Sequence, residues 1–316
     1  MPKPKIIAIV GPTASGKTSL SIFLAQKLGS PVKLRHGGAE IISADSRQVY
    51  RGLDIGTGKV TKKEMAGIPH HLLDVVSPKK QFAVSDFVRL AARAHSSILQ
   101  KARITILVGG TGLYIDTFLG RMSYPEVPPN PKLRAQLEKK SAPQLFAQLQ
   151  KLDPRRAANI EKENPRRLIR AIEIAKAIGA NPIPTLEQKY DVLWLGINPP
   201  QETLYKNIRT RLLSRITEGM VAEAKNLHTP APVGIGLSYK RMEALGLEYR
   251  FLSQLLQNKV SKEDFILGLE RAIQHYAKRQ IRWFKRNQDI HWVSSPPASR
   301  AGKAEAWRLA KEFLSR

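Results

Sequence analysis

The sequence contains no cysteine among its 316 residues. This absence excludes disulfide bonds, thiolate zinc sites and a cysteine nucleophile. Long apolar stretches are also missing, because runs such as residues 104–108 are far shorter than the roughly 20 residues that span a bilayer. The first ten residues lead directly into a short apolar run, without the apolar core and small-residue cleavage site of a secretion signal. We therefore expect a cytoplasmic protein that is not embedded in a membrane.

Acidic residues are scarce relative to basic ones. The chain has 26 Asp and Glu against 52 Lys and Arg, which leaves a net charge of +26. An excess of this size predicts a polyanionic partner, either a nucleic acid or an anionic membrane surface. A soluble protein with a merely basic surface is the alternative. The length suggests two domains, or one domain with a sizeable insertion.

The first third of the chain alternates short apolar runs with longer amphipathic stretches. Such alternation predicts a parallel sheet with helices on both faces. The runs are β-branched and continuously apolar, which is typical of strands buried on both faces. The predicted strands are residues 5–10, 40–45 and 104–110, and the predicted helices are residues 18–29 and 86–102.

The composition and the hydrophobic pattern of the sequence change near Arg121. A proline-rich break at residues 122–131 precedes a helical stretch, dense in Lys and Arg, that runs to residue 178. We predict an α/β domain of residues 1–121 and 191–316, interrupted by an all-helical insertion at 122–190. The later part of the α/β domain is predicted to hold a strand at 191–197, helices at 203–227, 240–256 and 261–286, and a short strand at 289–294.

Residues 11–18, here called the glycine loop, read GPTASGKT and match the G-x-x-x-x-G-K-[ST] motif between a strand and a helix. In this motif, which is typical of ATP-binding proteins, backbone N–H groups and a helix N-terminus bind a phosphate chain. Lys17 is placed to reach the distal phosphate, and the Thr18 hydroxyl to hold Mg²⁺. The predicted phosphate-binding residues are Gly11, Pro12, Thr13, Ala14, Ser15, Gly16, Lys17 and Thr18.

The second acid of a phosphate-loop NTPase is missing from its usual place. The strand that would carry it ends in Gly109-Gly110-Thr111, without an acid. Asp45 ends a different strand, and the ends of parallel strands gather where ligands bind. This pattern favours a reaction in which the phosphates leave as a unit while Asp45 removes a proton from the nucleophile. The alternative is that Asp45 only caps the next turn.

Six sequence blocks occur along the chain in the order GPTASGKT, IISADSRQVYRGLDIGTGK, GIPHHLLDVVSP, LVGGTGLY, NPRRLIRAIEI and YAKRQIRWFKR. Together they resemble one family. The sequence is similar to the tRNA dimethylallyltransferases, also called tRNA isopentenyltransferases, from Lys5 to about Arg286. The resemblance implies a phosphate-loop α/β fold with a helical tRNA-binding insertion. It implies an Mg²⁺-dependent enzyme that transfers a dimethylallyl group from dimethylallyl diphosphate to N6 of the adenosine 3′ to the anticodon. We expect a monomer that binds the tRNA anticodon stem-loop.

The resemblance also implies roles for single residues. Asp45 would be the general base on the adenine amino group, and Thr111 would help to fix the donor or the adenine. Lys17 and Arg211 would contact the diphosphate, although Arg211 could also be an ordinary surface charge. The residues implied in tRNA binding are Asp45, Ser46, Arg47, Gln48, Thr111, Arg134, Arg166, Arg167, Arg170, Tyr239, Lys240, Lys278 and Arg279. A solvated helix face is the alternative for the arginines of the insertion.

Some features depart from the family pattern. Asn207 stands where the family often has a further arginine, and Ser238 where it usually has glycine. The stretch before the second strand, residues 30–40, is longer than usual and predicts no function.

Three other functions compete with tRNA prenylation. An isopentenyltransferase for free AMP, ADP or ATP would not need the charge of +26 or the arginine-rich insertion. A phosphate-loop nucleotide kinase would need a strand-end metal acid together with an arginine-rich lid. A non-catalytic RNA-binding protein would not need to keep Lys17, Thr18, Asp45 and Thr111 together.

Overall fold

The computed structural model describes residues 3–29, 37–125, 127–180, 186, 188–293 and 299–316. Contacts divide the chain into two units, Met1–Met122 with Gln188–Arg316, and Ser123–Glu187. Each unit has its own apolar core. Most of the long stretch before the second strand lies outside the described residues.

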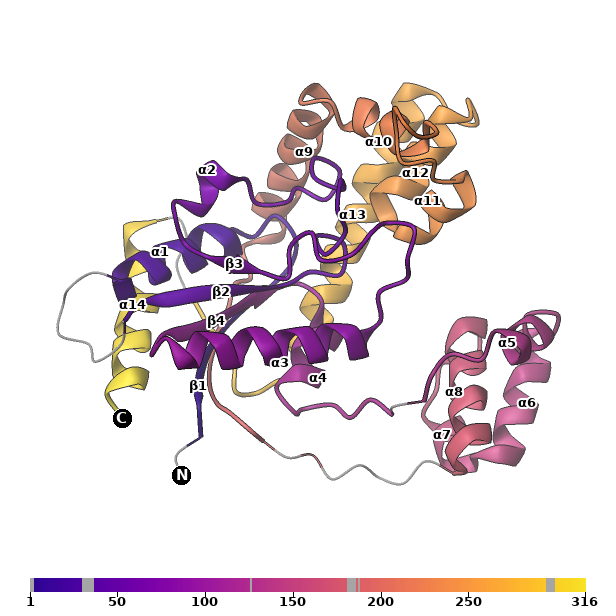
Figure 1. The fold of residues 1–316 in the computed structure, drawn as a ribbon, viewed down its shortest axis with the longest axis horizontal. Coiled ribbons are helices and arrows are strands. Elements are labelled where there is room, and N and C mark those ends of the chain that lie inside the picture. Colours follow the sequence, from indigo (N-terminus) through magenta and orange to yellow (C-terminus); the bar gives the residue numbers. More distant parts are fainter. Residues whose placement is uncertain (1–2, 30–36, 126, 181–185, 187, 294–298) are drawn as a thin grey trace. The chain divides into compact units, whose positions relative to one another are not determined.

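The first unit is built on a six-stranded sheet whose paired strands are all parallel (Figure 1). The strand order is β3-β2-β4-β1-β5-β6, so β1 lies between β4 and β5 with Ile7 opposite both Ile106 and Leu193. The predicted parallel sheet is thus confirmed. The strands are β1 (Lys5–Val10), β2 (Ala39–Ala44), β3 (His70–His71), β4 (Ile104–Gly109), β5 (Asp191–Gly196) and β6 (His291–Trp292).

Helices cover both faces of this sheet. One face packs against α1 (Lys17–Gly29) and α14 (Arg300–Ser315), which share a core with alternate strand residues such as Ile9 and Ile106. Helices α3 (Val84–Gln100) and α4 (Gly112–Phe118) pack against each other and contact the sheet at β4 (Figure 1). A short helix, α2 (Lys62–Met65), lies between β2 and β3. Burial on both faces explains why the strands are apolar at every position.

A second core in the first unit belongs to five later helices. Two of the predicted long helices are each divided by a glycine in the left-handed region, Gly219 with φ 104° and Gly246 with φ 115°. This core also contains Val49, Tyr50 and Leu53, so the helices pack on the segment that follows β2. The helices are α9 (Gln201–Thr217), α10 (Met220–His228), α11 (Tyr239–Leu245), α12 (Leu247–Leu256) and α13 (Lys262–Phe284).

The ends of the sheet differ from the prediction. The strand expected at 289–294 is limited in the described residues to β6, and residue 294 lies outside them. The edge strand β3 and helix α14 were not predicted. Two-residue strands carry too short a pattern to be recognised in a sequence.

The second unit consists, in its described residues, of four helices and no strand. Three of them begin with the same device, in which an Asn or Asp side chain accepts a hydrogen bond from a backbone N–H three residues on and proline follows directly. The capping residues are Asn130, Asp153 and Asn164. The helices are α5 (Pro131–Leu137), α6 (Ala142–Leu152), α7 (Pro154–Ala158) and α8 (Pro165–Ile178), which enclose a leucine-rich core.

Candidate active site

A cavity of about 830 Å³ lies in the first unit, where β1, β2 and β4 end. Because these strands are parallel, the loops that follow their carboxyl ends meet at one edge of the sheet. Helices α9, α12 and α13 complete the wall. The predicted site residues that line the cavity are Thr13, Ala14, Ser15, Gly16, Lys17, Thr18, Asp45, Ser46, Arg47, Gln48, Arg211 and Arg279.

The glycine loop forms the floor of this cavity. Ala14 and Gly16 are left-handed, with φ 60° and 91°, a conformation found in anion-binding turns. The buried Ser15 hydroxyl has no hydrogen-bond partner among the described residues. Burial lowers the pKa of Lys17 to about 7, with Asp45 acting in the opposite direction and Arg211 in the same direction. A bound anion would supply both a partner for the hydroxyl and a counter-charge for the ammonium group.

Asp45 both caps a turn and lines the cavity. Its Oδ1 accepts hydrogen bonds from the backbone N–H groups of Arg47 at 2.8 Å and Gln48 at 3.3 Å. The capping function weighed as an alternative is therefore present. It does not exclude a chemical role, because it fixes the carboxylate in one orientation at the cavity wall.

Thr111 joins the loops that follow β2 and β4. Its Oγ1 accepts a hydrogen bond from the backbone N–H of Ser46 at 3.1 Å, and its own N–H donates to the carbonyl of Ala44 at 3.2 Å. The Thr111 hydroxyl thus lies beside the turn that Asp45 caps. At the end of β4, where an NTPase carries its metal-binding acid, this chain uses a hydroxyl to position the neighbouring loop.

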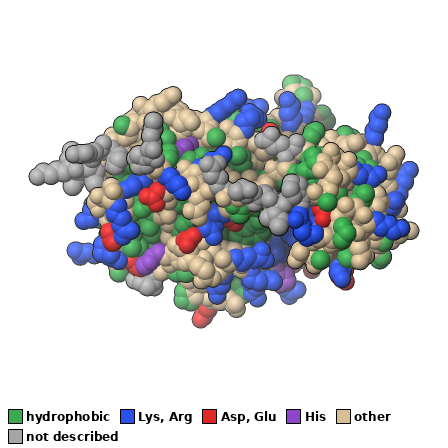
Figure 2. All heavy atoms as spheres, turned by 90° about the horizontal axis from the view of Figure 1, so that it is seen from below, with side chains coloured by type: hydrophobic (Ala, Val, Ile, Leu, Met, Phe, Trp, Pro, Cys, Tyr) green, Lys and Arg blue, Asp and Glu red, His purple; other side chains and the backbone are tan. Residues whose placement is uncertain are grey.

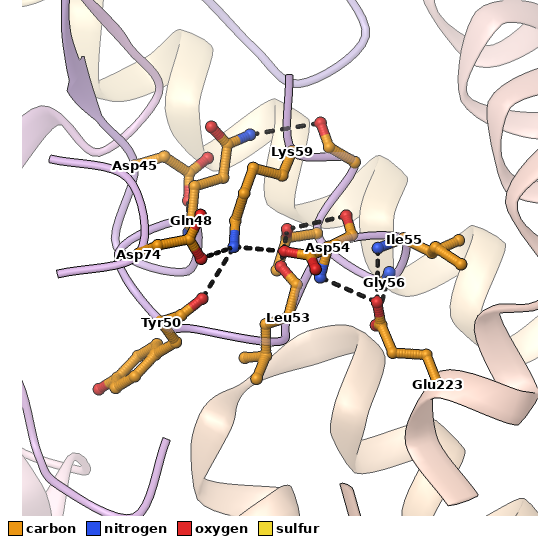
Figure 3. Close-up of polar contacts among 12 residues, drawn as sticks. Asp45, Gln48, Tyr50, Leu53, Asp54, Ile55, Gly56, Lys59, Asp74 and Glu223 are labelled. Atoms are coloured by element: carbon orange, nitrogen blue, oxygen red, sulfur yellow. Dashed lines mark hydrogen bonds and ion pairs between the residues drawn. The ribbon is translucent and has the colours of Figure 1, made fainter. Parts of the chain in front are cut away.

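Lys59 holds the base of the loop that follows this turn. Its side chain is 6% exposed, and its Nζ contacts Asp54 at 2.6 Å, Asp74 at 2.5 Å and the carbonyl oxygen of Tyr50 at 2.8 Å (Figure 3). Three oxygen partners satisfy all three ammonium donors. Residues 50–59 are thereby held against the segment that follows β3.

Glu223 of α10 holds the other end of the same loop. Its carboxylate accepts hydrogen bonds from the three successive N–H groups of residues 54–56, at 2.7–3.0 Å (Figure 3). The loop then presents Gly58 to the cavity, where its carbonyl oxygen accepts a bond from Gln48 Nε2 at 3.4 Å. A Cβ at Gly58 would lie 3.1 Å from Arg211 Nη2, so the loop also packs against that side chain.

The cavity contains oxygen donors of the kind that Mg²⁺ prefers, but few of them. Within the described residues, no group of three or more His, Asp or Glu side chains is arranged to hold a metal ion. The exposed Thr18 hydroxyl lines the cavity next to the glycine loop. Mg²⁺ commonly binds through one or two protein oxygens plus the oxygens of a substrate phosphate. The residues present fit an ion that arrives with a diphosphate.

Two site residues escaped the sequence analysis. Tyr276 lines the cavity beside Thr111, and burial raises the pKa of its hydroxyl to about 12. Gln280 accepts a hydrogen bond from the N–H of Thr13 at 2.8 Å and donates one to the carbonyl of Gly110 at 2.9 Å. A pattern did exist, because Gln280 interrupts the buried, otherwise apolar stripe of α13.

Comparison with known proteins identifies the family. The family model described as IPP transferase matches residues 48–287. The chain belongs to this family. A tRNA dimethylallyltransferase from Geotalea uraniireducens is 39% identical over 316 residues, covering 98% of this chain and 96% of the relative. One from Alkaliphilus oremlandii is 36% identical, with 92% of each chain covered.

Solved structures of IPP transferases share the fold. A tRNA isopentenylpyrophosphate transferase from Bacillus halodurans matches with a TM-score of 0.71 and 34% identity, over 99% of this chain and 97% of that one. A eukaryotic dimethylallyltransferase described as acting on tRNA matches with a TM-score of 0.80 and 25% identity, over 99% of this chain and 80% of that one. The predicted family and its α/β fold are confirmed.

Some residues that the IPP transferase resemblance assigned to tRNA lie apart from the cavity. Tyr239 stacks on His228, with ring centroids 3.9 Å apart, and lines a second cavity of about 810 Å³. Lys240 is exposed at the start of α11, and the neighbouring Ser238 caps that helix by accepting a bond from the N–H of Arg241. The first cavity is instead lined by residues 246–248 and by Arg250, from around the start of α12.

Asn207, which departs from the family pattern, contacts the glycine loop. Asn207 Nδ2 donates to the carbonyl oxygen of Ala14 at 3.4 Å, so this side chain reaches the backbone of the glycine loop.

On α13, the predicted tRNA-binding residues Lys278 and Arg279 are both exposed. Arg279 lines the cavity, and Lys278 lies over the ring of Tyr205.

The arginines of the helical unit divide into two groups. Arg166 and Arg167 are exposed on α8. Arg134 and Arg170 instead form ion pairs with the buried Glu173, at 2.7 and 2.5 Å. Burial alone would raise the pKa of Glu173, but hydrogen bonds from Arg134, the amide of residue 130 and Arg170 lower it to about 2.

Basic side chains outnumber acidic ones on the visible surface (Figure 2). Figure 2 shows many Lys and Arg and few Asp and Glu on the face that it presents, as the composition requires. Among the described residues, no helix is long and apolar enough to cross a membrane.

The Glu173→Gln substitution tests the charged centre of the helical unit. A carboxylate whose pKa is lowered by folding stabilises the folded state at any pH above 4.5, the pKa that it has in the unfolded chain. This stabilisation is lost as the pH falls toward its folded pKa of about 2. At pH 7 we expect Glu173→Gln to destabilise the unit by about 3 kcal/mol, because two arginines lose their carboxylate. Hydrogen exchange of α8 amides measures the difference from wild type.

The difference in free energy of unfolding between Glu173→Gln and wild type should shrink by more than half between pH 7 and pH 3. Glu163→Gln, which removes an exposed carboxylate from the same unit, serves as the control. A Glu173→Gln difference that is constant across this pH range would contradict the assignment.

Proposed function

We propose that this chain transfers a dimethylallyl group from dimethylallyl diphosphate to N6 of the adenosine 3′ to the anticodon of tRNA, and releases diphosphate. The observation that carries the proposal is that an anion-binding turn and an oriented carboxylate line the same cavity in a member of the IPP transferase family. The IPP transferase relatives named for tRNA support the choice of substrate.

The donor diphosphate would lie on the glycine loop. Ser15, whose hydroxyl has no hydrogen-bond partner among the described residues, lines the cavity together with Lys17 and Arg211. Binding of the diphosphate favours the protonated form of Lys17, whose charge the buried floor otherwise disfavours. In this proposal the loop holds the leaving group of the reaction.

Asp45 would act on the acceptor. As the lone pair of the adenine N6 forms a bond to C1 of the dimethylallyl group, the C1–O bond breaks and its electron pair leaves with the diphosphate. The proton of the attacking amino group passes to the Asp45 carboxylate, which the capped turn holds in place. Lys17 and Arg211 stabilise the negative charge that develops on the leaving diphosphate.

The side chains around Asp45 would position the adenosine. The Gln48 amide is held at both ends, by the carbonyl of Gly58 and by the hydroxyl of Ser43, each at 3.4 Å. The Thr111 hydroxyl fixes the backbone of Ser46. The Thr18 hydroxyl would hold Mg²⁺ together with diphosphate oxygens, and the ion would supply positive charge to the leaving group.

Transfer of a labelled prenyl group tests the function. The protein is incubated with labelled dimethylallyl diphosphate and Mg²⁺, together with either unmodified tRNA or AMP. We expect label in tRNA alone. Label in AMP alone would overturn the proposal in favour of an adenylate isopentenyltransferase. Phosphorylation of AMP by ATP, without prenyl transfer, would identify a nucleotide kinase.

Asp45→Asn tests the general base. The amide oxygen of asparagine can still accept the N–H groups of Arg47 and Gln48, so the turn should be kept while the proton acceptor is lost. We expect turnover to fall by roughly 10²–10⁴-fold with tRNA affinity preserved. Single-turnover transfer and filter binding measure the two quantities. Asp289→Asn, at an exposed carboxylate paired with Arg121, is the control. Wild-type turnover in Asp45→Asn would remove Asp45 from this role.

Proton uptake on diphosphate binding tests the state of Lys17. Because its pKa is about 7, Lys17 is largely neutral at pH 8 in the free protein and becomes charged beside the diphosphate. Titration calorimetry in buffers of different ionisation enthalpy should detect an uptake of up to about one proton at pH 8. Lys17→Arg, which stays charged, should bind without this uptake. Equal uptake in both proteins would show that Lys17 does not titrate on binding.

The salt dependence of tRNA binding tests the exposed arginines. Arg166→Ala combined with Arg167→Ala should lower the slope of log affinity against log salt by about 0.7–0.9 for each lost phosphate contact. Arg308→Ala with Lys311→Ala removes the same charge from α14 and is the control. If both pairs change the slope equally, Arg166 and Arg167 are an ordinary solvated face.

A further inference from the structure

Gln280 connects the glycine loop to the loop that follows β4. Among the described residues, no other side chain forms hydrogen bonds with both loops. Gln280 lies on α13 and is 6% exposed. Its Oε1 accepts the N–H of Thr13 in the glycine loop at 2.8 Å, and its Nε2 donates to the carbonyl of Gly110 after β4 at 2.9 Å. We propose that Gln280 is a positioning residue that sets the distance between the bound diphosphate and the turn carrying Asp45. This inference rests on the proposed prenyl transfer.

The two partners of Gln280 require an amide. Thr13 offers a donor and Gly110 an acceptor, so the bridging side chain needs an acceptor and a donor at the same distance from its backbone. A leucine of similar size would leave the buried Gly110 carbonyl and the half-buried Thr13 N–H without these partners, which disfavours the present arrangement of the two loops. An ionised glutamate would keep the bond to Thr13 but direct an oxygen at the Gly110 carbonyl.

The space around this bridge leaves little freedom. A Cβ at Gly110 would lie 2.1 Å from Gln280 Nε2, and one at Gly109 would lie 2.2 Å from the carbonyl oxygen of Ala44. Three residues along α13, Trp283 donates from Nε1 to Asp116 at 2.6 Å. Helix α13 is therefore attached to the segment after β4 at two points, while its bond to Thr13 reaches across to β1.

The bridge lies between the two halves of the proposed chemistry. On one side, Thr13 precedes Ser15 and Lys17 in the loop that would hold the diphosphate. On the other side, Gly110 precedes Thr111, whose hydroxyl accepts the N–H of Ser46 beside Asp45. Displacement of reacting groups by about 1 Å can cost on the order of 10² in rate, so a shift between these loops should lower kcat.

Gln280→Leu tests the bridge. We expect kcat for transfer to tRNA to fall by about ten- to a hundredfold. The affinity for inorganic diphosphate, measured by calorimetry, should stay within about threefold of wild type, because the other anion-binding groups remain. Gln274→Leu is the matched control, since Gln274 lies on the same helix and its amide bonds to Glu270.

Gln280→Glu provides a readout that a merely structural residue would not give. When the glutamate is protonated it can donate to the Gly110 carbonyl, as the glutamine does. The activity of this variant relative to wild type should therefore rise as the pH is lowered from 8 to 6. Asp45 is present in both proteins, so its titration cancels in the ratio.

The outcomes separate the inference from the function it rests on. Active wild type with an undiminished kcat in Gln280→Leu would overturn the inference alone. An activity ratio for Gln280→Glu that does not change with pH would show a structural residue and also overturn it. A loss of kcat in Gln280→Leu that comes with a similar fold loss of diphosphate affinity and a lower melting temperature would do the same. Wild type that transfers no label to tRNA would overturn the proposed function and this inference together.

Discussion

Parallel pairing of β1, β2 and β4 is the constraint on which the site depends. With Val10 and Ala44 both opposite Gly109, three strands end together at the same edge of the sheet. Their loops bring an anion-binding turn and a carboxylate to one cavity, and the Thr111 hydroxyl holds the turn beside that carboxylate, although the chain separates these groups by 30 to nearly 100 residues. The helices of the first unit then fix those loops from outside, through Gln280, Asn207 and Glu223.

The charges around this cavity fit the proposed diphosphate leaving group. Lys17 is held where burial disfavours its charge, and the Ser15 hydroxyl has no partner among the described residues. Both groups gain from a bound anion. The only acid among the predicted site residues, Asp45, is held by its own turn and is not enclosed in a metal-binding cluster of the described chain. Lys17 and Ser15 thus fit a diphosphate leaving group, and Asp45 fits an amine that loses a proton.

Local sequence patterns predicted the parts of the fold that depend on local physics. The strand before the glycine loop, the loop itself and the turn at Asp45 each have their signature within about ten residues, as do the Asn-Pro helix starts. The contacts of Gln280 span 267 and 170 residues, and no periodicity within α13 could specify them. Arg134 and Arg170 were expected to face tRNA, and their ion pairs with Glu173 depend on the packing of α5 against α8. The division of the long helices at Gly219 and Gly246 was also missed, because glycine within an amphipathic pattern is ambiguous.

In the proposed reaction the glycine loop holds the diphosphate that leaves the prenyl donor, and it does not bind ATP for hydrolysis. The most direct test is to measure, in one reaction with unmodified tRNA, dimethylallyl diphosphate and ATP, the diphosphate and the orthophosphate released for each prenyl group transferred. We expect one diphosphate for each transfer and no orthophosphate from ATP. Orthophosphate that appears in step with transfer, or transfer that requires ATP, would contradict it.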